Sequence, residues 1–426
     1  MKIRIILCAA LSALFLWNMM AWTAQEGTGI QSALAEEPTA ETASDMPASA
    51  QGERPEEYSP EWLEEKGLTL GESTVTYPAL KEGTLPEPLR QSVNDRILAD
   101  GDIRAYVTRI SQLISGGKLT VAWQGTLLGP VFSFAVSAEG AVATLRSTHV
   151  WTGGNIDLRD GHEISLKEIF TDPEAAGERM EAYLEEEVAP VLSAHLLNSQ
   201  VTPLPERFRL TERGIVWMYD VHQLSTLKDR AGDVLIPWQT VREWLNTAED
   251  GILADMGLRD RILSPEDLSE EERGETAARI RNAVAEGRIP GVPAALGDSV
   301  QALTDRWHLL TDPDVYQSGR LFSLEGAAFR DVFLMTDFLS ESWDYSVVDG
   351  IRLDLGSFYG LTVGETSRTA WQRLLGEPEH TVDMDGETAE ANRTVPGVRD
   401  YYTFGENRLV LHGDSEGVLT SVIVME

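Results

Sequence analysis

The sequence has few of the residues and spacings that usually indicate a catalytic or metal-binding site. It holds one cysteine in 426 residues, Cys8, which lies in an N-terminal apolar run. The folded part of the chain therefore has no disulfide and no thiolate chemistry. Its seven histidines include no HExxH or HxxxH spacing, which would place two metal ligands on one helix face. We predict no catalytic residue, no cofactor and no metal site.

Basic residues are also scarce. Lys and Arg number 35 against 69 Asp and Glu, giving a formal net charge of -34. A surface this negative repels nucleic acid and anionic membranes, and it attracts cationic partners. The simpler interpretation of the same charge is an acidic surface that keeps the protein soluble.

Two short matches to known motifs are incomplete. Residues 225–228 (STLK) fit the S-x-x-K of penicillin-recognising enzymes, but the companion SDN and KTG motifs are absent. Residues 383–386 (DMDG), with acids up to Glu390, resemble the start of a calcium loop. Its first and twelfth positions would be Thr381 and Asn392, which are wrong for that loop. An acidic hairpin tip is the simpler prediction.

The N-terminus has the layout of an export signal. Lys2 and Arg4 precede an apolar run from Ile5 to Trp22. Residues 1–22 are predicted to be a cleaved signal peptide or a retained membrane anchor, and both alternatives stay open. Either one puts the rest of the chain outside the cytoplasm. Residues 23–71 are acidic and rich in Pro and Ala, which predicts a disordered linker.

The first folded region is predicted over residues 72–248. Residues 73–80 are typical of a strand, residues 88–98 and 106–114 of helices, and residues 118–151 of antiparallel strands. Residues 155–170 (NIDLRDGHEISLKEIF) predict a strand, a tight turn at Asp160-Gly161 and a short helical turn. Further on we predict a helix over 175–197, kinked at Pro190, a hairpin around 208–220 and a final helix near 241–245.

The order of five segments resembles one known family. These are YPAL, NDRI, NIDLRDGHEISLKEIF, FRLTERGIVWMYD and GDVLIPWQTV, in residues 74–246. Together they resemble the extracytoplasmic domain shared by the lysozyme-sensing anti-sigma factor RsiV and the non-catalytic part of some peptidoglycan deacetylases. The resemblance implies helices packed on an antiparallel sheet, and a role in binding an envelope component or an extracellular protein. The anti-sigma factor carries a longer cytoplasmic segment than the four residues found here, and no deacetylase domain is evident.

The second folded region is predicted over residues 264–426, after a linker at 249–263. It begins with a capping box, Ser269-x-x-Glu272. Residues 296–314 and 362–379 then resemble each other, each with a tryptophan on an amphipathic turn followed by an acid-Pro pair. The region is therefore predicted to be an approximate tandem repeat, about 264–356 and 357–426.

This repeat resembles a helix-plus-antiparallel-sheet module found in exported bacterial proteins. Relatives of the module include the β-lactamase inhibitor protein and small outer-membrane lipoproteins of the SmpA/OmlA type. The segment Gly364 to Pro378 carries most of the likeness. The resemblance implies binding or scaffolding rather than catalysis. The fold class predicted for the whole chain is α+β, with helices packed on antiparallel sheets in two folded regions.

Five residues are candidates for a ligand surface. Trp123 and Trp343 lie beside polar residues and could contact a sugar or a protein, although burial in a core is the simpler alternative. Asn155, Asp157 and Asp160 could gather around a cation, although capping of turns is simpler.

The leading prediction is a non-enzymatic, exported cell-envelope protein. It would bind an extracellular protein or a peptidoglycan fragment, and its acidic charge favours a cationic muramidase such as lysozyme. One alternative is an enzyme acting on cell-wall glycan or peptide, with carboxylates assembled only in the fold. Another is a structural protein of the envelope.

Overall fold

The computed structural model describes residues 58–112, 117–142, 145–188, 204–219, 233–307, 313–324, 329–338 and 345–426. All of them belong to one compact unit, Arg54–Glu426. The predicted export segment, residues 225–228, Pro190 and Trp343 lie outside these ranges. Within the described ranges, no helix is long and apolar enough to cross a membrane.

The first region is built on a five-stranded sheet with the order β1-β2-β3-β4-β5. The strands are β1 Leu63–Leu70, β2 Ser73–Leu80, β3 Gly117–Leu128, β4 Val131–Val142 and β5 Leu145–Asp157. All neighbouring strands are antiparallel except β2 and β3, which run parallel. A parallel pair needs a crossover connection, and here the helices α2 Glu87–Asp100 and α3 Ile103–Gln112 provide it.

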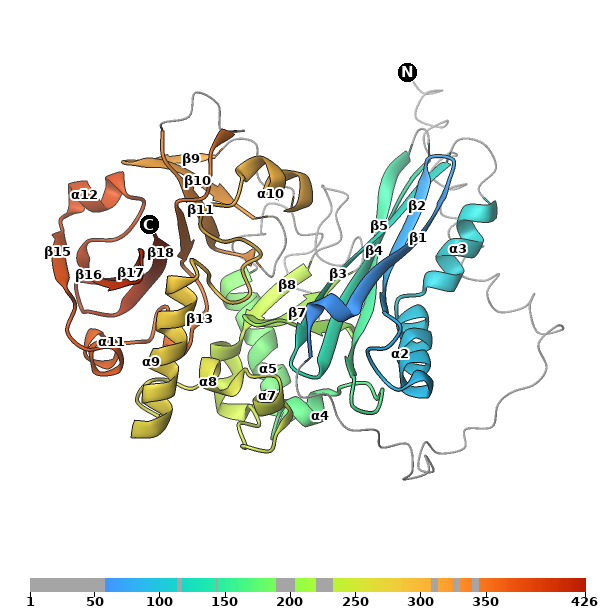
Figure 1. Ribbon diagram of the computed structural model, residues 1–426, viewed down its shortest axis with the longest axis horizontal. Coiled ribbons are helices and arrows are strands. Elements are labelled where there is room, and N and C mark those ends of the chain that lie inside the picture. Colours follow the sequence, from blue (N-terminus) through green and yellow to red (C-terminus); the bar gives the residue numbers. More distant parts are fainter. Residues whose placement is uncertain are drawn as a thin grey trace, which may run out of the picture. The chain divides into compact units, whose positions relative to one another are not determined.

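Helices α2 and α3 cover one face of this sheet (Figure 1). Val93 and Ile97 of α2 and Ile103 of α3 are almost fully buried against Phe132 and Phe134 of β4. The two phenylalanine rings stack on each other with centroids 5.3 Å apart. These contacts form the core of the first region.

Strand β1 lies inside the range predicted as a linker. Most of its side chains are exposed and its sequence, LEEKGLTL, does not alternate apolar and polar residues. Its backbone pairs with β2 along its whole length, from Leu63 opposite Leu80 to Leu70 opposite Ser73. The strand forms because β2 offers it a partner edge, which its own sequence pattern does not reveal.

The stretch 155–170 has the predicted local structure. Strand β5 ends at Asp157, the turn contains Gly161 with φ +81°, and a capping box between Ser165 and Glu168 starts the short helix α4 Leu166–Ile169. The backbone of Ile164 returns to β5 by donating to the carbonyl of Asn155. The turn therefore folds back onto the strand that precedes it.

A second, three-stranded sheet has the order β6-β7-β8 and is antiparallel. Its strands are β6 Phe208–Leu210, β7 Gly214–Met218 and β8 Asp233–Pro237. Around it lie α5 Pro173–Tyr183, the π-helical turn η3 Leu184–Val188, the 3-10 helix η4 Trp238–Trp244, α7 Ile252–Asp255 and α8 Arg259–Ile262. The side chains of Val216 and Leu235 belong to the same core as the second region.

Two predicted segments differ in detail. The helix predicted from residue 175 is α-helical only to Tyr183 and continues as a π-helical turn to Val188. The range 249–263, predicted as a linker, holds α7 and α8, whose Leu253 and Ile262 are buried in the core of the first region. Both helices have only four residues, too short for a recognisable helical period.

The second region is built on an eight-stranded antiparallel sheet with the order β15-β16-β17-β18-β12-β11-β10-β9. The strands are β9 Asp314–Tyr316, β10 Gly319–Ser323, β11 Val332–Thr336, β12 Gly350–Leu353, β15 His380–Met384, β16 Gly397–Phe404, β17 Asn407–Asp414 and β18 Leu419–Met425. The helices are α9 Glu270–Ala285, α10 Val300–Trp307, α11 Arg368–Leu375 and α12 Gly386–Ala391. The short strands β13 Ser357–Phe358 and β14 Leu361–Thr362 form a separate pair.

The eight strands form two halves of four. Strands β9 to β12 follow α10, strands β15 to β18 follow α11, and the halves join where β12 pairs with β18. Ile351 lies opposite Val424 at this junction. The capping box predicted at Ser269 and Glu272 is present at the start of α9. The likeness of the halves to a known tandem module stays a prediction.

Part of this sheet is covered by the chain itself. Arg352 of β12 is 5% exposed and donates hydrogen bonds to the backbone carbonyls of Asn392 and Arg393, just after α12. The ring of His412 on β17 contacts the carbonyl of Val395 at 2.8 Å. The segment after α12 is therefore fastened over this part of the sheet.

Candidate functional site

The tryptophan predicted at a ligand surface is engaged within the fold. Trp123 lies on β3, is half-buried and packs against the core under α2 and α3. Its indole Nε1 donates to a carboxylate oxygen of Glu65 on β1 at 2.9 Å. Both its apolar body and its polar edge therefore have partners inside the protein.

Asn155 is a structural residue of the first region. It is 2% exposed, and its amide oxygen accepts hydrogen bonds from the Ser133 hydroxyl at 2.8 Å and the Leu210 backbone at 2.9 Å. Its amide nitrogen donates to the carbonyl of Phe208 at 3.0 Å. These bonds fasten β6 to the large sheet. Both polar atoms of the amide therefore have partners within the fold.

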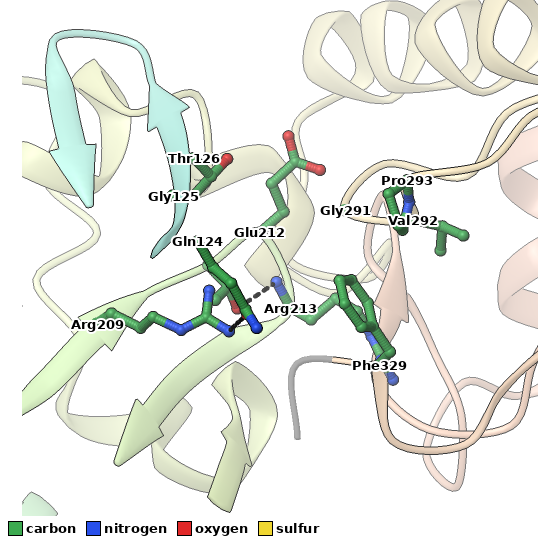
Figure 2. A pocket seen from close by; sticks show the side chains of 11 residues that line it. Gln124, Gly125, Thr126, Arg209, Glu212, Arg213, Gly291, Val292, Pro293 and Phe329 are labelled. Carbon is green, nitrogen blue, oxygen red and sulfur yellow. Dashed lines mark hydrogen bonds between the residues drawn. The ribbon is translucent and has the colours of Figure 1, made fainter. Parts of the chain in front are cut away.

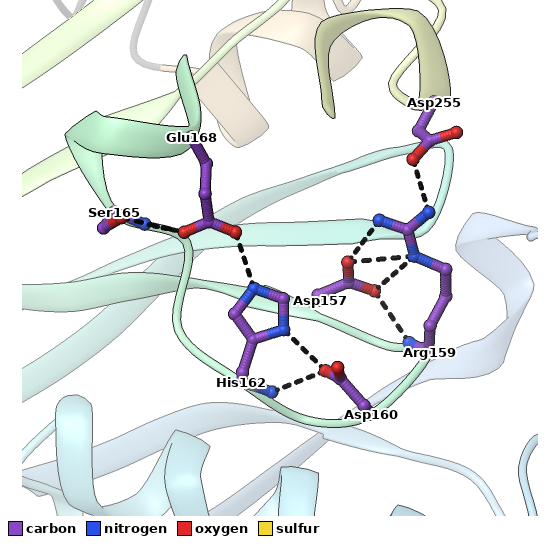
Figure 3. A network of polar contacts seen from close by, with 7 residues as sticks. All are labelled: Asp157, Arg159, Asp160, His162, Ser165, Glu168 and Asp255. Atoms are coloured by element: carbon purple, nitrogen blue, oxygen red, sulfur yellow. Dashed lines mark hydrogen bonds and ion pairs between the residues drawn. The ribbon is translucent and has the colours of Figure 1, made fainter. Parts of the chain in front are cut away.

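The charged residues of the turn form a network of polar contacts (Figure 3). The carboxylate of Asp157 is 1% exposed and pairs with Arg159 at 2.6 Å. Arg159 also pairs with Asp255 of α7, and these contacts together raise the pKa of the guanidinium. The turn is thereby linked to α7, and the carboxylate of Asp157 has its counter-ion, Arg159, within the fold.

His162 joins two carboxylates in the same turn. Its Nδ1 lies 2.6 Å from Asp160 and its Nε2 lies 2.7 Å from Glu168 (Figure 3). Partial burial lowers the pKa of His162, but the two carboxylates raise it, and the net change is upward. The pKa of Asp160 is shifted downward, because its hydrogen bonds to His162 outweigh its partial burial.

Asn155, Asp157 and Asp160 are close together in the sequence, and in the structure each has its own partners within the fold. A role for them in binding a ligand stays a prediction. Among the described residues, no group of three or more His, Cys, Asp or Glu could hold a metal ion. Asp385 of the acidic segment caps α12 by accepting from the backbone of Thr388.

A pocket lies elsewhere, between the first and second regions (Figure 2). Its volume is about 240 Å³. It is lined by residues 124–126 of β3, Arg209 of β6, residues 211–213 of the β6–β7 turn, residues 291–293 and Phe329. Residues from both folded regions therefore build one concave site, which is where small-molecule sites usually form.

Arg209 is the most unusual residue of this pocket. It is 5% exposed, and its Nη2 donates to the amide oxygen of Gln124 at 3.3 Å (Figure 2). Burial lowers the pKa of its guanidinium, and the negative charge of Asp233 opposes this. In the described parts of the chain, Arg209 has no ion-pair partner.

Arg213 has a different role. It is 3% exposed, and its Nη2 donates to the backbone carbonyls of Arg330 at 2.7 Å and Leu355 at 2.8 Å. Burial lowers its pKa to about 10, so it is still charged near neutral pH. Arg213 therefore links the β6–β7 turn to the second region and adds a positive charge at the pocket.

Glu212 is the only carboxylate among the described residues that line the pocket. One of its oxygens pairs with Arg261 at 3.2 Å. A glycosidase needs two carboxyl groups facing each other across its cleft, and this lining does not provide them. The chemistry of the pocket is that of a positively charged binding site with an apolar side.

Sequence reasoning missed Arg209 and Arg213. Isolated arginines belong to no motif, and the pocket joins residues as far apart as Gln124 and Phe329. The pattern itself gave no signal for them. In the segment FRLTERGIVW, Arg209 takes the polar position between Phe208 and Leu210, and Arg213 lies in the turn before Gly214.

No protein-family model matches the chain, and no curated protein is significantly similar to it. Among solved structures, a DUF3298 family member from Bacteroides fragilis is 13% identical, with 46% of this chain and 97% of that chain covered and a TM-score of 0.36. A DUF3298 protein from Pseudomonas aeruginosa is 16% identical, covers 43% and 94%, and has a TM-score of 0.31. A DUF4309 protein from Bacillus subtilis is 11% identical, covers 36% and 96%, and has a TM-score of 0.26.

All three TM-scores lie below 0.5, so these likenesses alone establish neither a family nor an activity for this chain. The fold class rests on the protein's own elements, which are helices packed on several mainly antiparallel sheets.

Proposed function

We propose that the chain is an exported cell-envelope protein that binds a cationic extracellular protein, a lysozyme-type muramidase being the leading candidate. The observation that carries this proposal is the net charge of -34. The Lys2 and Arg4 n-region and the apolar run behind it support export. Enzyme action on the cell wall and a purely structural role are the alternatives.

The distribution of buried charge supports a negative surface. Within the described ranges, the buried acids are Asp157 and Asp400, and the buried bases are Arg209, Arg213 and Arg352. Burial therefore removes more positive than negative side chains from contact with water. Among the described residues, the acidic excess is therefore left mainly in contact with water.

A negative surface affects association with a cationic protein in a specific way. Long-range attraction raises the encounter rate, and salt screens it over a Debye length of about 10 Å at 0.1 M. A stable complex also needs a close-packed contact that salt screens much less. Specific binding should therefore weaken with salt without disappearing.

The two folded regions would have different roles in binding. The resemblance of residues 72–248 to the RsiV-like domain supports recognition of the extracellular protein by that region. The resemblance of residues 264–426 to the tandem module supports protein binding or scaffolding by the second. The two four-stranded halves joined through β12 and β18 are compatible with such a module.

The test is a calorimetric titration of the full chain, in mild detergent, with a cationic muramidase at about 0.05 M and about 0.3 M salt. The control is the same muramidase with succinylated lysines, which is no longer cationic. Saturable binding at both salt concentrations, lost on succinylation, would support the proposal. Absence of binding, or equal binding of the succinylated protein, would contradict it and favour a different ligand or a structural role.

A further inference from the structure

We propose that the pocket around Arg209 is a second, independent site that binds a small carboxylate with an apolar body. This ligand is opposite in charge to the cationic protein proposed above. The site is built from β3, the β6–β7 hairpin, residues 291–293 and Phe329. Its contacting group is the guanidinium of Arg209.

Burial of Arg209 is the first argument. A guanidinium taken out of water loses hydration that must be replaced by a counter-charge and hydrogen-bond acceptors. Arg209 is 5% exposed and, within the described residues, receives one side-chain acceptor, the amide of Gln124 at 3.3 Å, and no carboxylate. It lines a pocket that a ligand can enter. An anion in this pocket would supply the missing partner.

The geometry of a guanidinium favours a carboxylate. Its planar fork presents parallel N–H groups that match the two oxygens of a carboxylate. Arg213 strengthens the local positive charge, but its Nη2 is already used by the carbonyls of Arg330 and Leu355. Arg209 is therefore the residue that would contact the ligand, and Arg213 would act through its charge and by holding the wall in place.

The remaining wall and the size of the pocket restrict the rest of the ligand. Val292 and Phe329 are buried apolar residues, and Pro293 lies beside them. These side chains give the ligand an apolar surface rather than more hydrogen-bond donors. A volume of about 240 Å³ is slightly below the range of roughly 300–1,000 Å³ that is usual for drug-sized ligands. The ligand should be comparable in size to a single amino acid.

Salt should affect this site differently from a protein–protein contact. The chain has a net charge of -34, so a small anion approaches against long-range repulsion. Added salt screens this repulsion, while the buried contact with Arg209 is screened much less. Binding of the carboxylate should therefore hold steady or tighten as moderate salt is added.

The test uses 4-methylpentanoate as the probe and its neutral amide, 4-methylpentanamide, as the matched control, with the full chain in mild detergent. Ligand-observed NMR reports both affinities, and inorganic phosphate is titrated as a competing anion. We expect the carboxylate to bind at least about tenfold more tightly than the amide, because a hydrogen bond to a charged group is worth this much or more. Tighter binding of phosphate, or equal binding of acid and amide, would overturn the proposal.

Two variants assign the binding to this pocket. Arg209→Met removes the guanidinium and should abolish the difference between acid and amide. Phe329→Trp enlarges the opposite wall and should weaken the carboxylate even if Arg209→Met does not fold. Arg207→Met is the control, because Arg207 lies outside the pocket lining and donates to the carbonyl of Trp151. Wild-type affinity in folded Arg209→Met, or in Phe329→Trp, would refute the site, whether or not a muramidase binds.

Discussion

The amide oxygen of Asn155 accepts a hydrogen bond from the backbone N–H of Leu210 at a distance of 2.9 Å. Asn155 lies near the end of the long strand β5, and Leu210 ends the short strand β6 that carries Arg209. This bond therefore helps to position the wall of the pocket.

We expect Asn155→Ala to destabilise the protein strongly. The change takes this buried partner from the Ser133 hydroxyl and the Phe208 carbonyl, whereas the Leu210 N–H keeps its hydrogen bond to the Ser133 oxygen. Each buried group left unpaired costs about 1–3 kcal/mol, so the total should be about 2–4 kcal/mol after relaxation. Urea unfolding measures it, with Glu249→Ala in an exposed turn as the control. A loss no larger than that of the control would show that the network is not formed.

His162 should make stability depend on pH. Its pKa in the folded protein is raised, so the folded state holds the proton more tightly than the unfolded state does. The resulting stabilisation is fully present below the unfolded pKa of about 6.5 and is lost as the pH rises through the folded pKa. The difference in urea midpoint between wild type and His162→Gln should therefore be larger at about pH 6 than at about pH 9. Equal differences at both pH values would contradict the contacts with Asp160 and Glu168.

The capping box of α9 gives a second electrostatic test. The backbone N–H of Glu272 donates to the Ser269 hydroxyl, and the carboxylate of Glu272 accepts from the Ser269 backbone at 2.8 Å and pairs with Arg259. Hydrogen bonds from Ser269 and Arg259 lower the pKa of Glu272 to about 2. Ser269→Ala should cost about 1 kcal/mol of unfolding free energy.

The stabilisation from Glu272 should be present above its unfolded pKa, near 4.5, and be lost as the pH falls through about 2. Glu275→Gln is the matched control, because Glu275 is an exposed acid on the same helix outside the box. If Glu275→Gln and Glu272→Gln lowered the unfolding free energy equally near neutral pH, the capping contacts would not contribute to stability as predicted.

Two glycines provide a matched test of the backbone. Gly161 has φ +81° in the turn after β5, whereas Gly177 lies within helix α5 with no neighbouring atom within 4 Å of an added Cβ. Gly161→Ala should destabilise the protein by about 1 kcal/mol, because an L side chain disfavours positive φ. Gly177→Ala should stabilise it by about 0.5–1 kcal/mol. Thermal unfolding of both variants checks the predicted opposite signs, and a shared sign would contradict them.

Capping boxes, tight turns and single strands could be predicted from the sequence because they depend on residues that are neighbours in the chain. The Ser269 and Glu272 spacing defines a capping box, and Asp160-Gly161 defines a tight turn. Strand β2 was predicted at its observed bounds, because Ser73–Leu80 is rich in β-branched and aromatic residues. The parallel pairing of β2 with β3 could not be predicted, since it depends on where α2 and α3 return the chain.

The candidate pocket could not be predicted from the sequence, for a physical reason. Its residues come from β3, the β6–β7 hairpin, residues 291–293 and Phe329, and only the packing of the two regions brings them together. The predicted residue Trp123 was chosen for its polar neighbours, and one of its contacts, Glu65, lies on a strand that the pattern did not reveal. Sequence thus predicted many of the elements but not the contacts between them.

We propose that the acidic surface recruits a cationic extracellular protein. The most direct measurement is the association rate of a cationic muramidase with the full chain as salt is raised from about 0.05 M to about 0.3 M. We predict that the association rate falls steeply while the dissociation rate changes little, because steering acts before contact. An association rate that does not respond to salt, or no association at all, would contradict the claim.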